Sequence, residues 1–156
     1  MSVPPEPAYL ESEATLDAFL AGFHDGTFPI AQWTHGAHVV MAVGVLWRHA
    51  VPHALTVARE AIRHYNERQG GRNTATSGYH ETLTRLWLGA IAGFLATVPA
   101  DCGRVEAARL AWYAFAGQRA LFKEWYSYDL VSSVAARAAW CAPDRRRHLV
   151  EVIQVD

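Results

Sequence analysis

Apolar residues recur along most of the chain at intervals of three and four positions, the spacing that places side chains on one face of an α-helix. The first such series predicts a helix over residues 15–24 and consists of Leu16, Phe19, Leu20 and Phe23. Similar series predict further helices over residues 31–50, 53–67, 79–98, 105–125 and 129–140. Strand-like alternation of apolar and polar residues is nearly absent. The pattern therefore predicts an all-α, single-domain bundle of about five to six helices.

Three segments lack this periodicity. Residues 1–10 are rich in proline and predict an irregular N-terminal arm, and residues 145–156 predict an irregular or extended tail. Residues 69–78 are rich in glycine, serine and threonine, which predicts a loop between the third and fourth helices. A chain of 156 residues can bury a full core in one domain, so residues 1–156 are expected to form a single helical unit.

The composition limits both the class of protein and the kinds of partner that are expected. Apolar residues make up 51% of the chain and charged residues 19%, which excludes an intrinsically disordered protein. A formal net charge of -1 gives no reason to expect nucleic acid or an anionic membrane surface as a partner. The sequence shows neither an uninterrupted membrane span nor a signal peptide, and two cysteines are too few for a disulfide framework. A cytoplasmic location is therefore expected.

Most candidate metal-binding and catalytic residues lie in two short motifs. These are W-T-H-G-A-H at residues 33–38 and G-Y-H-E-T-L-T at residues 78–84. His35 and His38 lie one turn apart on one predicted helix, and His80 heads the apolar stripe of another. If the two helices run parallel, the three imidazoles converge. Buried imidazoles need partners for their ring nitrogens, and bundle metal sites use the i, i+3 spacing. The motifs therefore predict a divalent metal site, and imidazole ligands suit Fe, Zn, Cu or Ni.

The same three residues also have a purely structural interpretation. In that case His35 caps a turn, His38 packs in the core and His80 bonds a main-chain carbonyl group. Histidine pairs at i, i+3 occur by chance, so the spacing alone leaves both interpretations open.

Residues beside His80 are the candidate catalytic groups. Glu81 could act as a general base on a metal-bound water, although an acid in the first turn of a helix is also favoured by the helix dipole. Tyr79 could donate its phenol to a substrate, or it could simply form the edge of the core.

Candidate substrate-binding residues lie before and after this motif. Arginine can hold an anionic group, while a loop arginine is more often solvated, and turn chemistry also accounts for the other polar residues. The candidates are Arg72, Asn73, Thr74, Arg85 and Tyr126.

Together, these motifs resemble an uncharacterised family of small bacterial helical proteins. The resemblance rests on W-T-H-x-x-H at residues 33–38, Asn66, Asn73-Thr74 and Y-H-E-T-x-T at residues 79–84, and it extends over about residues 28–144. It implies no specific reaction. It does imply that the two histidine motifs belong to one site.

Three classes of function follow from these features. The leading hypothesis is a metal-dependent enzyme that acts on a small organic molecule. Oxidative chemistry is slightly favoured over a zinc-water hydrolase because six Trp, six Tyr and six Phe residues could build an apolar pocket. The second hypothesis is a non-catalytic ligand-binding bundle. The third is an interaction module whose exposed aromatic side chains form a dimer face, and a homo-oligomer is compatible with the sequence.

Overall fold

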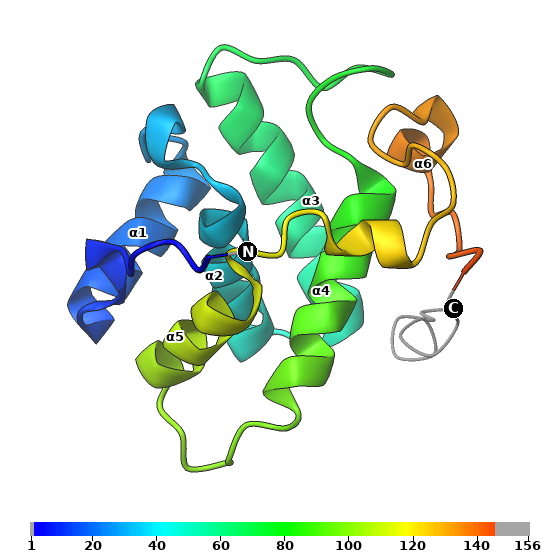
Figure 1. Ribbon diagram of the computed structural model, residues 1–156. Coiled ribbons are helices and arrows are strands. Elements are labelled where there is room, and N and C mark those ends of the chain that lie inside the picture. Colours follow the sequence, from blue (N-terminus) through cyan, green and yellow to red (C-terminus); the bar gives the residue numbers. More distant parts are fainter. Residues whose placement is uncertain (1, 146–156) are drawn as a thin grey trace.

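The computed structural model describes residues 2–145, and all the regular structure in this range is helical (Figure 1). The α-helices are α1 (Glu13–Asp25), α2 (His35–Arg48), α3 (Val51–Arg68), α4 (Glu81–Leu95), α5 (Arg104–Phe115) and α6 (Val134–Ala138). Short 3₁₀ turns cover Ala8–Leu10, Ile30–Gln32 and Leu121–Glu124. The predicted all-α helical bundle is confirmed. The expected tail from residue 146 onward lies outside the described residues.

Side-chain caps define where several helices begin. Ser12 accepts a hydrogen bond from the Thr15 N–H group at 3.2 Å, and the Thr15 hydroxyl oxygen accepts the Ser12 N–H group at 3.0 Å. Thr34 caps α2 by accepting the Ala37 N–H group at 3.2 Å. Such contacts satisfy amide groups that have no partner within the helix. The cap of α2 fixes the point at which the first histidine motif becomes helical.

Helix α2 lies at the centre of the bundle and packs against α3, α4 and α5. It meets α5 closely at Gly36, where an added Cβ atom would lie 2.2 Å from the Trp112 ring. The lack of a side chain at Gly36 therefore allows the indole to cross the start of α2 directly. The Trp112 indole N–H group donates to the Pro4 carbonyl at 3.2 Å, which holds the N-terminal segment across α5 (Figure 1).

Two predicted helices are shorter in the structure. Helix α5 ends at Phe115 instead of residue 125, because the following residues turn and enter a second apolar cluster around Phe122 and Trp125. Helix α6 covers residues 134–138 instead of 129–140. Ser133 caps it by accepting the Ala136 N–H group at 3.2 Å, so the residues before it form a turn. The prediction was wrong here because apolar spacing alone does not mark a change of packing partner.

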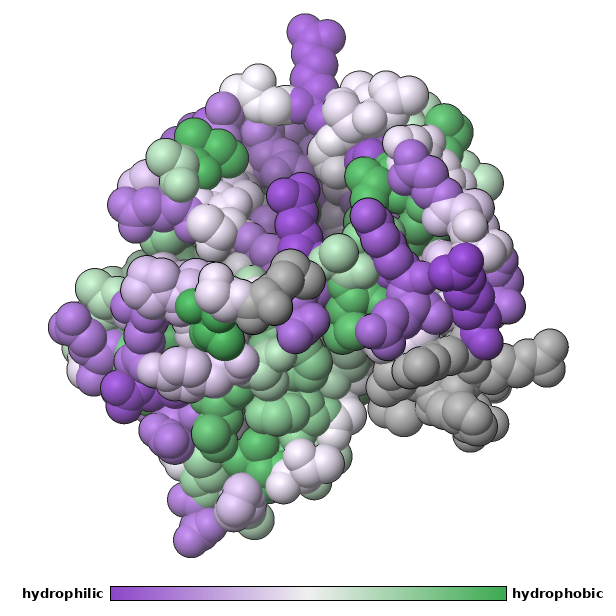
Figure 2. Space-filling model, viewed as in Figure 1, coloured by the Kyte–Doolittle hydropathy of each residue, from purple (hydrophilic) through white to green (hydrophobic). Residues whose placement is uncertain are grey.

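The surface in Figure 2 separates into two regions. Hydrophobic residues gather over the lower parts of α4 and α5, whereas hydrophilic residues dominate the opposite half of this face. Within residues 2–145, none of the helices combines the length and the apolar character needed to span a bilayer.

Candidate functional site

The beginnings of α2 and α4 line one cavity of about 470 Å³, which we call the histidine cavity. This volume lies in the range of natural small-molecule sites. His35, His38 and His80 all line it. Its walls are largely apolar and include Trp33, Val39, Met41, Ala42, Ile62, Leu83, Trp87, Leu88, Ile91 and Phe122. The structure therefore brings the two sequence motifs to one cavity.

His38 presents one free ring nitrogen. Its Nδ1 atom lies 2.8 Å from the Thr34 carbonyl oxygen, and because a carbonyl only accepts, Nδ1 must carry the proton. The Nε2 atom then holds a lone pair. Burial lowers the pKa of His38, and the Trp33 ring lies 4.1 Å from the imidazole. His38 is thus a neutral hydrogen-bond acceptor.

His35 is more unusual because its Nε2 atom is buried and has no hydrogen-bond partner among the described residues. The main chain of Phe115 also interacts with the ring and favours its protonated form, but this effect on the pKa is smaller than that of burial. Burial is the main reason that the pKa of His35 falls to about 4, so the ring is neutral at pH 7. The Trp87 ring lies 4.6 Å away. A buried ring nitrogen without a partner therefore lies at the cavity.

His80 differs because both of its ring nitrogens are already bonded to main chain. Nδ1 accepts the Leu83 N–H group at 3.2 Å and thereby caps α4. Nε2 donates to the Leu130 carbonyl at 2.9 Å. With no lone pair left, His80 cannot coordinate an ion in this arrangement. It performs the structural role that the sequence left open as an alternative.

The residues present do not fit a three-imidazole metal centre. No group of three or more His, Cys, Asp or Glu side chains within residues 2–145 is arranged to hold a metal ion. His35 and His38 keep free Nε2 atoms, but His80 adds no third lone pair. Metal dependence therefore stays a prediction from the sequence.

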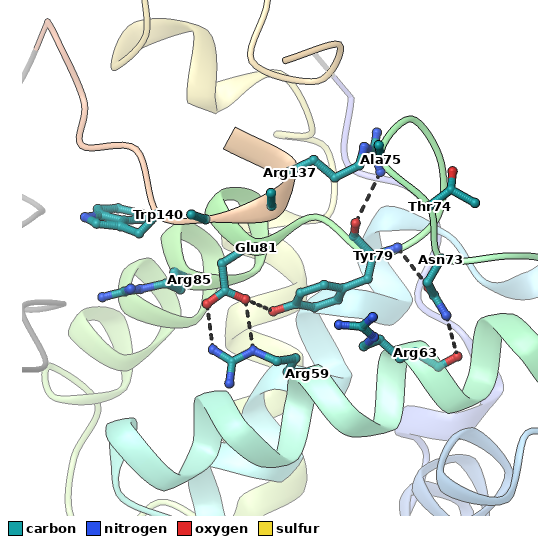
Figure 3. Close-up of a pocket in the computed structure, with 12 residues that line it drawn as sticks. Arg59, Arg63, Asn73, Thr74, Ala75, Tyr79, Glu81, Arg85, Arg137 and Trp140 are labelled. Atoms are coloured by element: carbon teal, nitrogen blue, oxygen red, sulfur yellow. Dashed lines mark hydrogen bonds and ion pairs between the residues drawn. The ribbon is translucent and has the colours of Figure 1, made fainter. Parts of the chain in front are cut away.

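Glu81 faces a second pocket on the other side of Tyr79 (Figure 3). The Arg59 guanidinium group binds both Glu81 carboxylate oxygens, at 3.0 and 2.6 Å. The Tyr79 hydroxyl donates to Glu81 Oε2 at 2.6 Å. Burial alone would raise the pKa of Glu81, but the hydrogen bonds from Arg59 and Tyr79 outweigh it and lower the pKa. A carboxylate paired in this way is a poor general base, and it does not line the histidine cavity.

This second pocket, which we call the arginine pocket, has a volume of about 660 Å³. The residues that line it are Arg59, Arg63, Asn73, Thr74, Ala75, Tyr79, Glu81, Arg85, Arg137, Ala138, Ala139 and Trp140. Among residues 2–145, only Tyr79 and Arg137 line both pockets. The single site expected from the sequence is therefore divided into two adjacent pockets.

Asn73 organises the loop between α3 and α4. Its Oδ1 atom accepts hydrogen bonds from the Asn66 side chain and the Tyr79 N–H group, both at 3.0 Å. Its Nδ2 group donates to the Arg63 carbonyl at 3.0 Å and to Glu67 at 3.1 Å. These bonds occupy the whole amide, so Asn73 positions Tyr79 and has no group left for a substrate.

The other substrate-binding candidates are dispersed. Thr74 lines the arginine pocket but uses its hydroxyl group within the loop, where it accepts the Ser77 N–H group at 3.1 Å. Arg72 is exposed and lines neither pocket. Tyr126 is buried in the second apolar cluster and donates to the Cys141 carbonyl at 2.7 Å. Of the five candidates, Arg85 alone both lines a pocket and has a buried polar atom without a partner among the described residues.

Sequence reasoning missed four arginines that line the pockets. Arg59 and Arg63 are one turn apart on α3, and that spacing was an available signal. Arg119 lines the histidine cavity from the turn after α5, where no motif marks it. Arg137 comes from α6 and donates to the Gly78 carbonyl at 2.7 Å. Contacts between segments so far apart in the chain leave no local pattern.

Comparisons of the chain with protein-family models, with curated proteins and with solved structures find no match. The family resemblance of the two motifs stays a prediction. The function is therefore inferred from the two pockets themselves.

Proposed function

We propose that the protein binds a small, largely apolar organic molecule in the histidine cavity, with a hydroxyl or N–H group of that molecule donating to His35. The observation that carries this proposal is the buried, unpartnered Nε2 atom of His35 in a cavity of about 470 Å³. A buried polar atom without a partner is costly, and a ligand that supplies a donor removes that cost.

The positions of the polar groups suggest the orientation of the ligand. His35 and His38 are neutral acceptors one turn apart on α2, so a donor group of the ligand would lie at the start of this helix. Trp33 and Trp87 flank the two imidazoles and offer flat faces to an aromatic ring. The apolar body of the ligand would then contact Ala42, Leu88 and Ile91 on the cavity wall.

Naphthalene and 2-naphthol test this proposal because they differ only in one hydroxyl donor. We expect the wild-type chain to bind 2-naphthol about threefold to tenfold more tightly than naphthalene, which is the usual net value of one hydrogen bond. In the H35F variant the two compounds should bind equally. Equilibrium dialysis at pH 7 gives both dissociation constants.

A matched substitution at an exposed histidine serves as the control. His64 lies on α3 outside both pockets, so H64F should keep the full preference for 2-naphthol. The proposal is wrong if neither compound binds saturably to the wild-type chain, or if H35F keeps the preference.

A second candidate is the metal-dependent enzyme predicted from the sequence. The two Nε2 lone pairs of His35 and His38 favour it, because the i, i+3 spacing is used by ligands in helical-bundle metal sites. In this version His80 positions α4 and is not a ligand. Other coordination positions would be left to solvent or substrate.

Elemental mass spectrometry of tag-free protein tests the second candidate. It predicts one divalent ion per chain in the wild type, loss of that ion in H35F, and retention in H80N, because His80 has no free lone pair. Metal-free wild-type protein, or equal metal content in H35F, would contradict it.

A further inference from the structure

We infer that the arginine pocket is a second binding site, and that it takes an organic phosphate monoester. The pocket has a volume of about 660 Å³ and contains groups that the histidine cavity does not use. This inference does not depend on the ligand proposed for the histidine cavity.

The charge balance of the arginine pocket is strongly positive. Four guanidinium groups and one carboxylate line it, which gives a net charge of +3 within the lining. Arg59 and Tyr79 already bind the oxygens of Glu81. The other three guanidinium groups, those of Arg63, Arg85 and Arg137, form no ion pair with any carboxylate among residues 2–145. An anion is the partner that would balance them.

Arg85 is the residue that points most directly to a bound anion. Its Nε atom is buried and has no hydrogen-bond acceptor among the described residues. Its guanidinium group lies 4.9 Å from the centre of the Trp140 ring, a cation–π contact that fixes the orientation of the side chain. The donor is therefore held in place and lacks only an acceptor. Native structures rarely keep a buried donor unpaired, and its partner is a protein group, an ordered water, a ligand or an ion. In a pocket that is rich in cationic groups, an anion is the partner that also balances the charge.

The other cationic groups are distributed around the same space (Figure 3). The Arg63 guanidinium group lies 5.9 Å from the Tyr79 ring, and Arg137 reaches in from α6 with hydrogen bonds to the Gly78 and Tyr79 carbonyls. The hydrogen bonds of Arg137 hold its side chain in place, so little of its side-chain entropy is lost when an anion binds.

These features favour a phosphate monoester over a carboxylate. A dianion matches a net charge of +3 better than a monoanion does, and planar guanidinium groups bind phosphate oxygens in pairs. The pocket is also larger than inorganic phosphate requires. Ala75, Ala138 and Trp140 provide apolar contacts for an organic substituent.

Phenyl phosphate is the probe, and isothermal titration calorimetry at pH 8 is the measurement. We expect one saturable site per chain, with binding at least tenfold tighter than that of benzoate. R85M should weaken phenyl phosphate binding by about tenfold to a hundredfold, because it removes charge-assisted hydrogen bonds but keeps an apolar side chain. R63M, which changes an exposed arginine, provides the same test if R85M does not fold.

R72M is the matched control, since Arg72 is a nearby exposed arginine that lines neither pocket, and it should change the affinity less than twofold. Equal weakening by R72M and R85M would show only nonspecific charge attraction and overturn the inference. So would the absence of saturable binding at millimolar phenyl phosphate, or tighter binding of benzoate. H35F should leave phenyl phosphate binding intact, which separates this site from the histidine cavity.

Discussion

The position of each histidine relative to its helix determines which of its ring nitrogens a ligand can reach. His80 is the N-cap of α4, so Nδ1 turns back to its own helix while Nε2 meets the Leu130 carbonyl. His35 and His38 belong to the first turn of α2, and their rings extend from it into the cavity. The Thr34 carbonyl holds Nδ1 of His38, and Nε2 of His35 is buried without a partner, so Nε2 is the ring nitrogen that is left for a ligand in both residues. All three residues are histidines, but their positions relative to the helix start determine which ring nitrogen is free to bind a ligand.

The Arg59–Glu81 pair should contribute measurably to stability. E81Q keeps the shape of the side chain but leaves the Arg59 charge unpaired in an already cationic pocket. Breaking a fully buried pair costs about 3–5 kcal/mol, and because a third of the Arg59 side chain is exposed we expect about 1–2 kcal/mol. Urea unfolding followed by circular dichroism measures this loss. E60Q, at the exposed neighbouring acid on α3, is the control, and an equal effect in both variants would show that the pair is not stabilising.

At the scale of helices, apolar periodicity was sufficient to locate α1 to α4, because burying one face of a helix is a local property of the sequence. It failed at the end of α5, where the residues after Phe115 remain apolar but pack into a different cluster. The site was predictable only in part for a related reason. His80 and Glu81 are adjacent in sequence, but His80 is the extended N-cap residue and Glu81 is the first residue of α4, so their side chains point in different directions. Because they are adjacent in the sequence, they were predicted to share one site. In the structure, Glu81 lines the arginine pocket and does not line the histidine cavity.

At the scale of the whole molecule, Tyr79 and Arg137 form the boundary between the two pockets. Tyr79 is held from both sides: Asn73 accepts a hydrogen bond from its N–H group, and Glu81 accepts a hydrogen bond from its hydroxyl group. Arg137 ties α6 to the main chain of the same segment. Because α3, α4 and α6 meet at this boundary, each pocket depends on the packing of distant segments.

The buried neutral imidazole of His35 should make the whole molecule less stable in mild acid. Its pKa is lowered from 6.5 to about 4, so between these values the unfolded chain binds a proton that the folded chain does not. The stabilisation is complete above about pH 6.5 and is lost as the pH falls toward 4, which corresponds to about 2 kcal/mol between pH 7 and pH 5. Urea unfolding in buffer with a chelator measures this slope. H35F should reduce the slope by that amount and H64F should keep it, whereas an unchanged slope in H35F would show that His35 is already protonated or exposed in the folded protein.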